Sequence, residues 1–307
     1  MKYEGENLVC CYLWQDDILK VVVVSDVHLG YDCSDRDKFD QFLDHLSQDS
    51  DATHFVLLGD IVDMWRRDAS GVFLESHGLL EKILALTKKM KVYFLAGNHD
   101  YHLRHLVNNN KPGRFYPIQF IPDPSYNVEN DPEKEHTGFV LNDEDSNCQY
   151  LFKHGWEYDP EQHRPVMESM CHVMSDDAGD VESTVWSVLT QGPKEWLVWL
   201  KSHVEPDLRQ QIRDVQIRPE DRLKDSLGQV EQNACKDVKP NQVLVFGHTH
   251  IPFVNTKENV ANTGSWVTDA ADRYDTYVEL SNGKPRLFVF GGPQQIPQQI
   301  PPTKVLC

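Results

Sequence analysis

Five short apolar segments of this chain are each followed directly by a polar turn that carries aspartate, asparagine or histidine. Residues 53–58, for example, run straight into the turn that contains Asp60 and Asp63. A single turn of this kind is common, because its carboxylate accepts hydrogen bonds from nearby backbone N–H groups. Five of them in one chain require a shared explanation, which strongly constrains the fold.

The first hundred residues alternate predicted strands with predicted helices. In residues 35–48, for example, large apolar side chains recur every three or four residues, which is the period of an amphipathic helix. Repeated strand–helix units predict a sheet whose parallel strands all end at one edge. The strands expected here are 19–25, 53–58 and 91–96, and the helices are 35–48 and about 73–90.

Further strands are predicted in the second half of the chain. Asn282-Gly283 is typical of a two-residue hairpin turn between the last two of them. Two packed sheets flanked by helices would accommodate this number of strands, so we expect an α/β fold. The additional strands are expected at 137–142, 148–153, 242–246, 276–280 and 286–290.

The polar turns all follow the carboxyl ends of predicted strands. In an open α/β sheet, ligands bind beyond those ends, so the five turns should converge on one crevice. Several buried carboxylates and imidazoles are costly unless cations compensate them. The turns carry Asp26 and His28; Asp60 and Asp63; Asn98, His99 and Asp100; His154; and His248 and His250.

The chemistry of these side chains indicates the kind of metal. A set of His, Asp and Asn ligands without Cys suits Mn²⁺, Fe²⁺, Co²⁺, Ni²⁺ or Zn²⁺ better than Mg²⁺. There are too many ligands for one ion. Two ions that share a carboxylate form the arrangement that holds a phosphoryl group during in-line displacement. We therefore expect two divalent ions, with Mn²⁺ favoured.

The composition of the chain limits which partners it can bind and in which cellular compartment it is expected. The chain has 48 acidic and 30 basic residues, a formal net charge of -18, which disfavours nucleic acid without excluding it. The seven cysteines have no C-x-x-C spacing and indicate neither a disulfide framework nor a thiolate metal site, so a reducing cytoplasm is expected. We find no targeting signal and no apolar run long enough to span a membrane. The oligomeric state is left open.

The chain divides into one catalytic domain and a short tail. Residues 1–292 are expected to form the domain, with a helical, Trp-bearing insertion at about 156–236 between two ligand-bearing turns. That insertion is a candidate cap over the substrate, although packing against the domain would also account for most of its aromatic residues. Residues 293–307 are rich in Pro and Gln and are expected to be disordered or loosely docked.

The ordered motifs D-x-H, G-D-x-x-D, G-N-H-D, H-G and G-H-x-H resemble those of the calcineurin-like metallophosphoesterase superfamily over residues 20 to about 266. The resemblance implies a four-layer αββα sandwich of two mixed sheets. It also implies that one ion is bound by Asp26, His28 and His250, that the other is bound by Asn98, His154 and His248, and that Asp60 bridges them. The turn at 262–265 resembles the family's N-x-G-S turn, which shapes the backbone near the site.

The resemblance places His99 outside the ligands and facing the substrate. There it implies a general acid or an electrostatic stabiliser of the leaving oxygen, oriented by Asp100. Asp63 is expected either to position Asp26 or His28 or to cap the helix that follows. Arg66 and Arg67 are candidates to bind a substrate phosphate, and salt bridges to nearby acids are an equal alternative.

The predicted function is hydrolysis of a phosphomonoester, phosphodiester or pyrophosphate bond in a small phosphorylated substrate, by attack of a metal-bound hydroxide. The helical insertion after H-G and the stretch G-D-I-V-D-M-W also resemble the UDP-diacylglucosamine hydrolase branch, which typically has Arg where this chain has His99. That departure favours a general phosphoesterase. A repair-type nuclease is a further alternative, disfavoured by charge, and a non-catalytic scaffold is the weakest because every ligand type is present.

Overall fold

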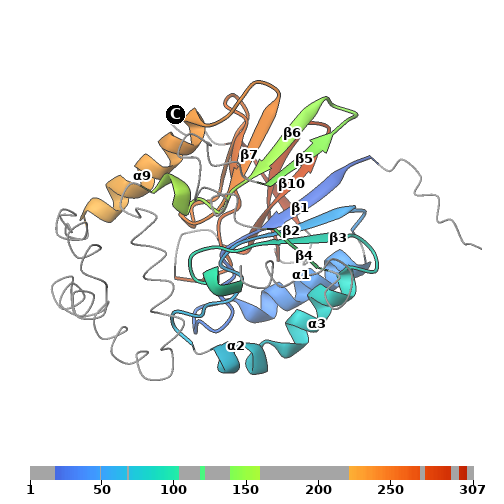
Figure 1. The fold of residues 1–307 in the computed structure, drawn as a ribbon, viewed down its shortest axis with the longest axis vertical. Helices are drawn as coiled ribbons and strands as arrows, with labels where there is room; N and C mark the ends of the chain where they lie inside the picture. The colour runs from blue at the N-terminus through green and yellow to red at the C-terminus, as the bar shows by residue number, and fades with distance from the viewer. Residues whose placement is uncertain are drawn as a thin grey trace, which may run out of the picture.

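The computed structural model describes residues 18–48, 50–67, 69–103, 118–121, 139–159, 221–269, 274–291 and 297–302. Two β-sheets lie face to face, and helices lie on the outer side of each (Figure 1). Most of the predicted insertion, residues 160–220, lies outside the described residues. Its expected role as a cap therefore stays a prediction.

The first sheet has seven strands in the order β12-β11-β10-β1-β2-β3-β4. The strands β1, β2 and β3 run parallel, as the strand–helix alternation predicts, and the short strand β4, which was not predicted, is parallel to β3. The strand β10 pairs antiparallel with β1. The strands are β1 (Lys20–Val24), β2 (His54–Leu58), β3 (Lys91–Leu95), β4 (Gln119–Phe120), β10 (Thr276–Ser281), β11 (Lys284–Val289) and β12 (Gln298–Ile300).

The second sheet has five strands in the order β5-β6-β7-β9-β8. Its three central strands run parallel, and the two edge strands are antiparallel to their neighbours. It therefore also presents carboxyl ends of parallel strands at one edge. The strands are β5 (Phe139–Asp143), β6 (Cys148–Phe152), β7 (Gln242–Phe246), β8 (Phe253–Asn255) and β9 (Val260–Asn262).

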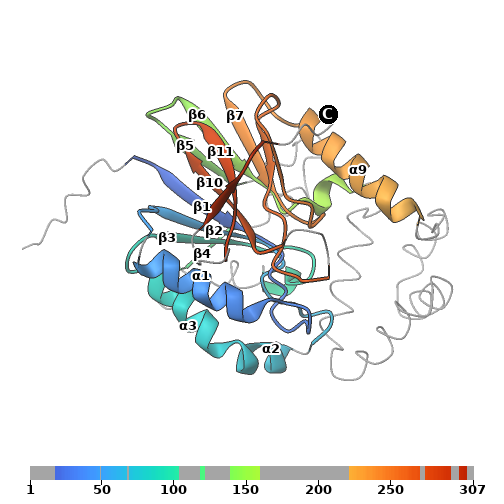
Figure 2. The same cartoon turned by 180° about the vertical axis from the view of Figure 1, so that it is seen from behind.

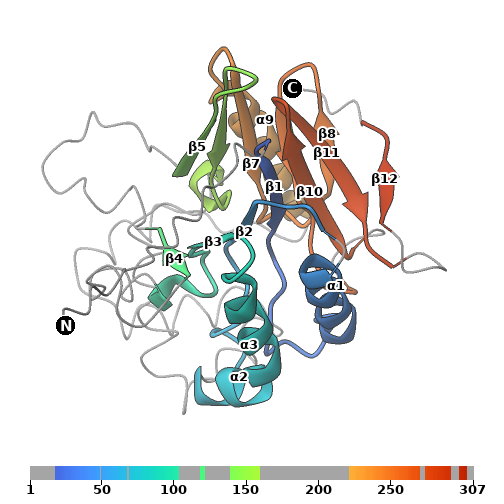
Figure 3. The same cartoon turned by 90° about the vertical axis from the view of Figure 1, so that its right-hand side faces the viewer.

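Helices cover the outer face of each sheet (Figures 1 and 2). The helix α1 (Arg36–Gln48) buries Phe39, Phe42, Leu43 and Leu46 against the first sheet, which are the residues whose spacing predicts it. The helices α2 (Ala69–Glu75) and α3 (His77–Leu86) lie on the same side, and α9 (Asp221–Lys236) covers the second sheet. Figure 3 shows this arrangement from the side.

Three apolar clusters separate the four layers. Alternate residues of β1 point to opposite faces, so Val22 and Val24 contact the α1 side whereas Val21 and Val23 meet the second sheet. The third cluster joins the second sheet to Val230 and Ala234 of α9. The order helix, sheet, sheet, helix confirms the predicted αββα sandwich.

Two local expectations differ from the structure, and a third is confirmed. The helix expected at about 73–90 is two helices, because Ser76 has φ -100° and ψ 7° and interrupts the helical path. The tail expected to be disordered contains β12, which pairs antiparallel with β11 and buries Ile300. The predicted hairpin is present, and Asn282 and Gly283 adopt the positive φ angles (51° and 69°) that its turn requires.

The cysteines also differ from expectation at one position. Cys33 and Cys148 carry free thiols, whereas Cys235 in α9 is disulfide-bonded, which the spacing of the cysteines did not indicate. Among the described residues, no helix is both long and apolar enough to cross a membrane.

Candidate metal centre

The five polar turns meet where the parallel strands of the two sheets have their carboxyl ends. Backbone hydrogen bonds hold neighbouring turns together: Asp26 N–H donates to the carbonyl of Gly59 at 3.1 Å, and His28 N–H donates to that of Asp60 at 2.9 Å. In the second sheet, Gly247 N–H donates to the carbonyl of His154 at 2.8 Å. The predicted convergence on one site is therefore observed, because each turn continues a strand that ends at this edge.

Five of the predicted ligands have a left-handed backbone conformation. Their φ angles are 54° at Asp26, 52° at His28, 52° at Asp60, 67° at His248 and 58° at His250. This conformation is uncommon for residues with a side chain and concentrates at functional sites, where the surrounding structure holds it in place. The left-handed conformation is energetically unfavourable at these residues, and it directs their side chains toward one point.

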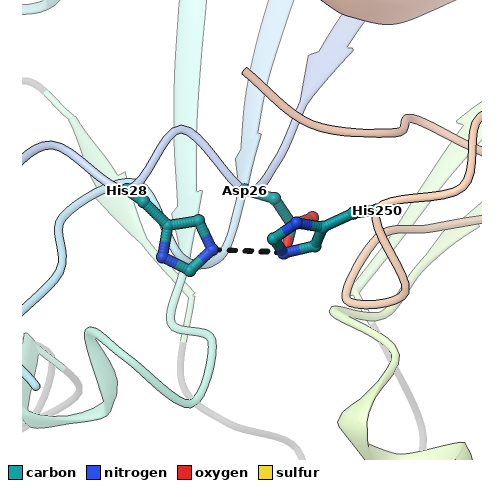
Figure 4. A group of neighbouring side chains, drawn as sticks. All are labelled: Asp26, His28 and His250. Carbon is teal, nitrogen blue, oxygen red and sulfur yellow. Dashed lines mark hydrogen bonds and ion pairs between the residues drawn. The ribbon is translucent and has the colours of Figure 1, made fainter. Parts of the chain in front are cut away.

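Asp26, His28 and His250 form the first cluster (Figure 4). Asp26 Oδ1 lies 3.2 Å from His250 Nε2 and 3.9 Å from His28 Nε2, and the two Nε2 atoms are 3.3 Å apart. Asp26 Oδ1 is buried and has no hydrogen-bond partner among the described residues. An unpartnered buried carboxylate oxygen that faces two imidazole nitrogens matches a cation site.

Asp60, His154 and His248 form the second cluster, beside Asn98. His154 Nε2 lies 3.3 Å from Asp60 Oδ2 and 3.2 Å from Asn98 Oδ1. The same Asp60 oxygen is 3.8 Å from His28 Nε2 of the first cluster. Asp60 is therefore the carboxylate that faces both clusters, as a bridging ligand would.

Glycine permits the close approach of these turns. A Cβ at Gly97 would collide with the Asp60 carboxylate, and one at Gly247 would collide with that of Asp26. The turn at 262–265 supports the same region, because the Asn262 amide donates to the carbonyl of Gly247 at 3.0 Å. The backbone role predicted for this turn agrees with that contact.

His28 and His154 each face a cluster through one ring nitrogen and are held through the other. His28 Nδ1 lies 3.0 Å from Asp63 Oδ2, and His154 Nδ1 lies 2.8 Å from the carbonyl oxygen of Leu58. These contacts fix Nδ1 as the protonated nitrogen and leave Nε2 free to bind a metal. A third contact joins His248 Nε2 to Asp159 Oδ2 at 3.3 Å.

Charge accumulates in the crevice. Burial alone would raise the pKa of Asp26, but the imidazoles, His250 above all, outweigh it and lower that pKa to about 2. Burial likewise opposes charge on His154, yet the Asp60 carboxylate raises the pKa of its imidazole to about 10. Ionised carboxylates in this buried site attract positive charge, which metal ions or protons can supply.

Asp63, rather than Asp100, orients His99. His99 Nδ1 lies 3.1 Å from Asp63 Oδ1, whereas Asp100 accepts from the backbone N–H groups of Ile61 (2.7 Å) and Gly97 (2.6 Å). The expectation that Asp100 lies behind His99 is therefore wrong; Asp100 ties two turns together. Of the two roles expected for Asp63, the contact with His28 is present. Its contact with the backbone N–H of Arg66 at 2.9 Å closes a turn and does not cap a helix, because the next helix begins only at Ala69.

His99 is a partly exposed member of the site. Its side chain is 12% exposed, compared with 2% for Asp60, and the ring stacks on Trp65 with 4.1 Å between centroids. Burial lowers the pKa of His99, but the carboxylates of Asp63 and Asp60 outweigh it, so the pKa is raised. Sequence analysis gave Trp65 no role, because the stretch G-D-I-V-D-M-W contains this residue without indicating what its ring contacts.

Arg66 and Arg67 both form salt bridges with acidic side chains. Arg66 pairs with Asp63 and lies over the ring of Tyr31, and Arg67 pairs with Glu75. The structure thus shows the salt-bridge alternative for both residues and gives no support to a direct phosphate contact.

A family model described as calcineurin-like phosphoesterase matches residues 19–252, which include every predicted ligand. The chain belongs to the calcineurin-like phosphoesterase family. That family uses divalent metals, and its α/β sandwich fold agrees with the two sheets and their helices described above.

The sequence relatives match a shorter part of the chain. UDP-2,3-diacylglucosamine hydrolase of Shewanella baltica is 35% identical over 86 residues, which is 28% of this chain and 35% of that protein. The chain therefore spans about a third of the length of the relatives that it matches.

Two solved structures are similar to most of the chain at low sequence identity. Yfce, a phosphoesterase from E. coli, is 16% identical with a TM-score of 0.44 and covers 92% of this chain and 98% of its own. A dimetal phosphatase from Danio rerio is 11% identical with a TM-score of 0.38 and covers 89% of this chain and 99% of its own. At these TM-scores the likenesses add no argument about activity.

Proposed function

We propose that this protein hydrolyses phosphoesters at a binuclear metal centre. The observation that carries the proposal is the position of Asp60, whose Oδ2 lies between the two clusters at 3.3 Å from His154 and 3.8 Å from His28. In the proposed centre Asp26, His28 and His250 hold one divalent ion. Asn98, His154 and His248 hold the other, and Asp60 bridges them.

The ions supply two kinds of chemistry when bound: they lower the pKa of water and neutralise charge on the phosphoryl oxygens. The nitrogen and oxygen ligands, without cysteine, fit Mn²⁺ and also Fe, Zn, Co or Ni. The protein's own contribution is to fix the ligand geometry through the strand-end turns and to bury the carboxylates, which strengthens their attraction for cations.

His99 is the residue proposed to act on the leaving group. Asp63 binds its Nδ1, so Nε2 is available to donate a proton to the leaving oxygen or to stabilise its charge. The ring of Trp65 stacks on the His99 ring and restricts its orientation, which reduces the entropy cost of orienting His99 in the transition state. His99 is thus held at two positions, and in this proposal it is not a metal ligand, although its ring lies close enough to His28 and Asp60 for the three to hold an ion.

The substrate class follows from the site and its surroundings. A small phosphomonoester or phosphodiester is favoured, because the net charge of -18 repels long polyanions. The match to UDP-2,3-diacylglucosamine hydrolase supports cleavage of a nucleoside diphosphate conjugate as a second candidate. His99 in place of that branch's arginine argues against the same substrate.

The test is a substrate panel of phosphomonoesters, phosphodiesters, nucleoside diphosphate conjugates and DNA, assayed with added Mn²⁺ and again after chelation. We expect chelator-sensitive turnover of a small ester, weakly dependent on salt. Steep loss of activity with salt would instead indicate nucleic acid. Asp51→Asn, at an exposed carboxylate paired with Lys20, is the matched control for Asp60→Asn. Turnover that is unaffected by Asp60→Asn would refute the binuclear centre.

A further inference from the structure

Asp159 contacts a proposed metal ligand but belongs to none of the motifs. It follows the short 3-10 helix η3 (Trp156–Tyr158), five residues after His154. Its side chain is 9% exposed, and its Oδ2 lies 3.3 Å from Nε2 of His248, whose ring is 8% exposed. A carboxylate this buried, against an imidazole that faces a cation site, requires a role.

The contact determines which nitrogen of His248 faces the metal. An imidazole has two ring nitrogens, and the one that donates to a carboxylate is protonated and cannot bind a metal at the same time. His28 and His154 donate through Nδ1 and are left with Nε2. His248 is arranged in the opposite sense, because its Nε2 is the nitrogen that meets the acceptor.

We propose that Asp159 is a positioning residue that accepts the Nε2–H of His248 and so presents Nδ1 of that ring to the ion shared with Asp60 and His154. This inference rests on the proposed binuclear centre. Carboxylates that hold a ligating histidine in this way fix both its tautomer and its ring orientation, and their removal typically weakens metal binding by about 10- to 100-fold.

The backbone of Asp159 is itself held in place from two directions. Its N–H donates to the carbonyl of Trp156 at 3.1 Å, and the Asn233 amide of α9 donates to the carbonyl of the preceding Tyr158 at 3.0 Å. The Tyr158 hydroxyl also donates to Asp237, just beyond α9, at 2.6 Å. The helix on the outer face of the second sheet therefore supports a ligand of one metal through η3.

The test compares Asp159→Ala with Asp159→Asn. The amide oxygen of Asn can still accept from His248 Nε2–H, whereas Ala removes the acceptor. Mn²⁺ affinity and stoichiometry are measured by competition with a chelating dye. We expect Asp159→Ala to weaken one of the two ions by about 10- to 100-fold and to leave the other unchanged, and Asp159→Asn to restore most of the loss. Asp269→Ala, at an acid bonded to Tyr31, is the matched control.

A second measurement reads the tautomer directly and does not depend on Asp159→Ala folding. In the Zn²⁺-loaded wild-type protein, ¹⁵N NMR of the histidine rings should show His248 protonated at Nε2 and metal-bound at Nδ1. Metal-bound Nε2 would overturn the proposal. Equal losses in the Ala and Asn variants would overturn it too, since they would show that the charge of Asp159 matters rather than its hydrogen bond.

Failure of this inference is distinguishable from failure of the proposed function. If the wild-type protein binds fewer than two ions, the binuclear centre itself is wrong. If it binds two and both Asp159 variants retain both with unchanged affinity, only the role of Asp159 is refuted.

Discussion

Asp63→Asn should weaken one metal ion selectively, because the two oxygens of this fully buried carboxylate have different partners. Oδ1 accepts from the backbone N–H groups of Trp65 (3.1 Å) and Arg66 (2.9 Å) and lies 3.1 Å from His99 Nδ1. Oδ2 lies 3.0 Å from His28 Nδ1 and pairs with the Arg66 guanidinium. An Asn that keeps its oxygen at the Oδ1 position preserves three of these contacts.

The new amide group would then face His28 Nδ1. Two donors cannot share one hydrogen bond, so His28 must shift its proton to Nε2 or turn away, and either change removes Nε2 as a metal ligand. We expect the ion held with Asp26 and His250 to bind about 10- to 100-fold more weakly, which corresponds to about 1.4–2.7 kcal/mol. The mispaired donors should also lower the unfolding free energy of the metal-free protein by about 1–3 kcal/mol.

The assay is a two-site Mn²⁺ titration against a chelating dye, together with urea unfolding of the metal-free protein. Asp143→Asn is the matched control, since that buried carboxylate accepts from the Tyr150 hydroxyl at 2.6 Å and contacts no proposed ligand. It should lower stability without changing either metal affinity. Equal weakening of both ions by Asp63→Asn, or weakening of neither, would refute the assignment of Asp63 to His28.

Three further changes test other parts of the molecule. Asp60→Asn should abolish turnover and lower bound metal, as measured by metal analysis of the purified variant, and near-normal activity would contradict the bridge. His99→Asn should keep both ions but lower kcat by about 10²- to 10⁴-fold on esters with poor leaving groups and less on nitrophenyl esters; equal losses would favour electrostatic stabilisation over proton donation. Burial and the neighbouring Asp35 raise the pKa of Asp275 to about 7, so the unfolded chain binds fewer protons than the folded one between about pH 4 and 7, and stability is lost as pH rises through that range. Asn tolerates the local φ of 57°, so Asp275→Asn should remove that loss of stability. We expect the variant to stabilise the metal-free protein by on the order of 1 kcal/mol at pH 8, after solvent screening, and not at pH 4. Urea unfolding at both pH values checks this, and an equal effect at both would contradict the shifted pKa.

Local sequence determined the parts of this protein that depend on neighbouring residues. The apolar runs that form β1, β2 and β3 are visible because both faces of these strands are buried. The helical spacing of Phe39 and Phe42 is visible because α1 shows one face to the core. The glycine-bearing hairpin turn is visible because few residues tolerate its backbone angles. The polar turns at the strand ends follow from the same pattern, and with them the convergence of the site.

Only the tertiary structure shows which side chains of these turns contact one another. Asp63 rather than Asp100 meets His99, and Asp159 meets His248 across 89 residues of sequence. The short strands β8, β9 and β12 likewise form by pairing with neighbouring strands, which segments of three residues do not reveal. The ion pairs of Arg66 and Arg67 were only one of two alternatives in the sequence. Hydrogen bonds depend on distances of a few ångströms between atoms that the chain brings together only on folding, and a residue pattern specifies which groups are available without specifying which of them meet.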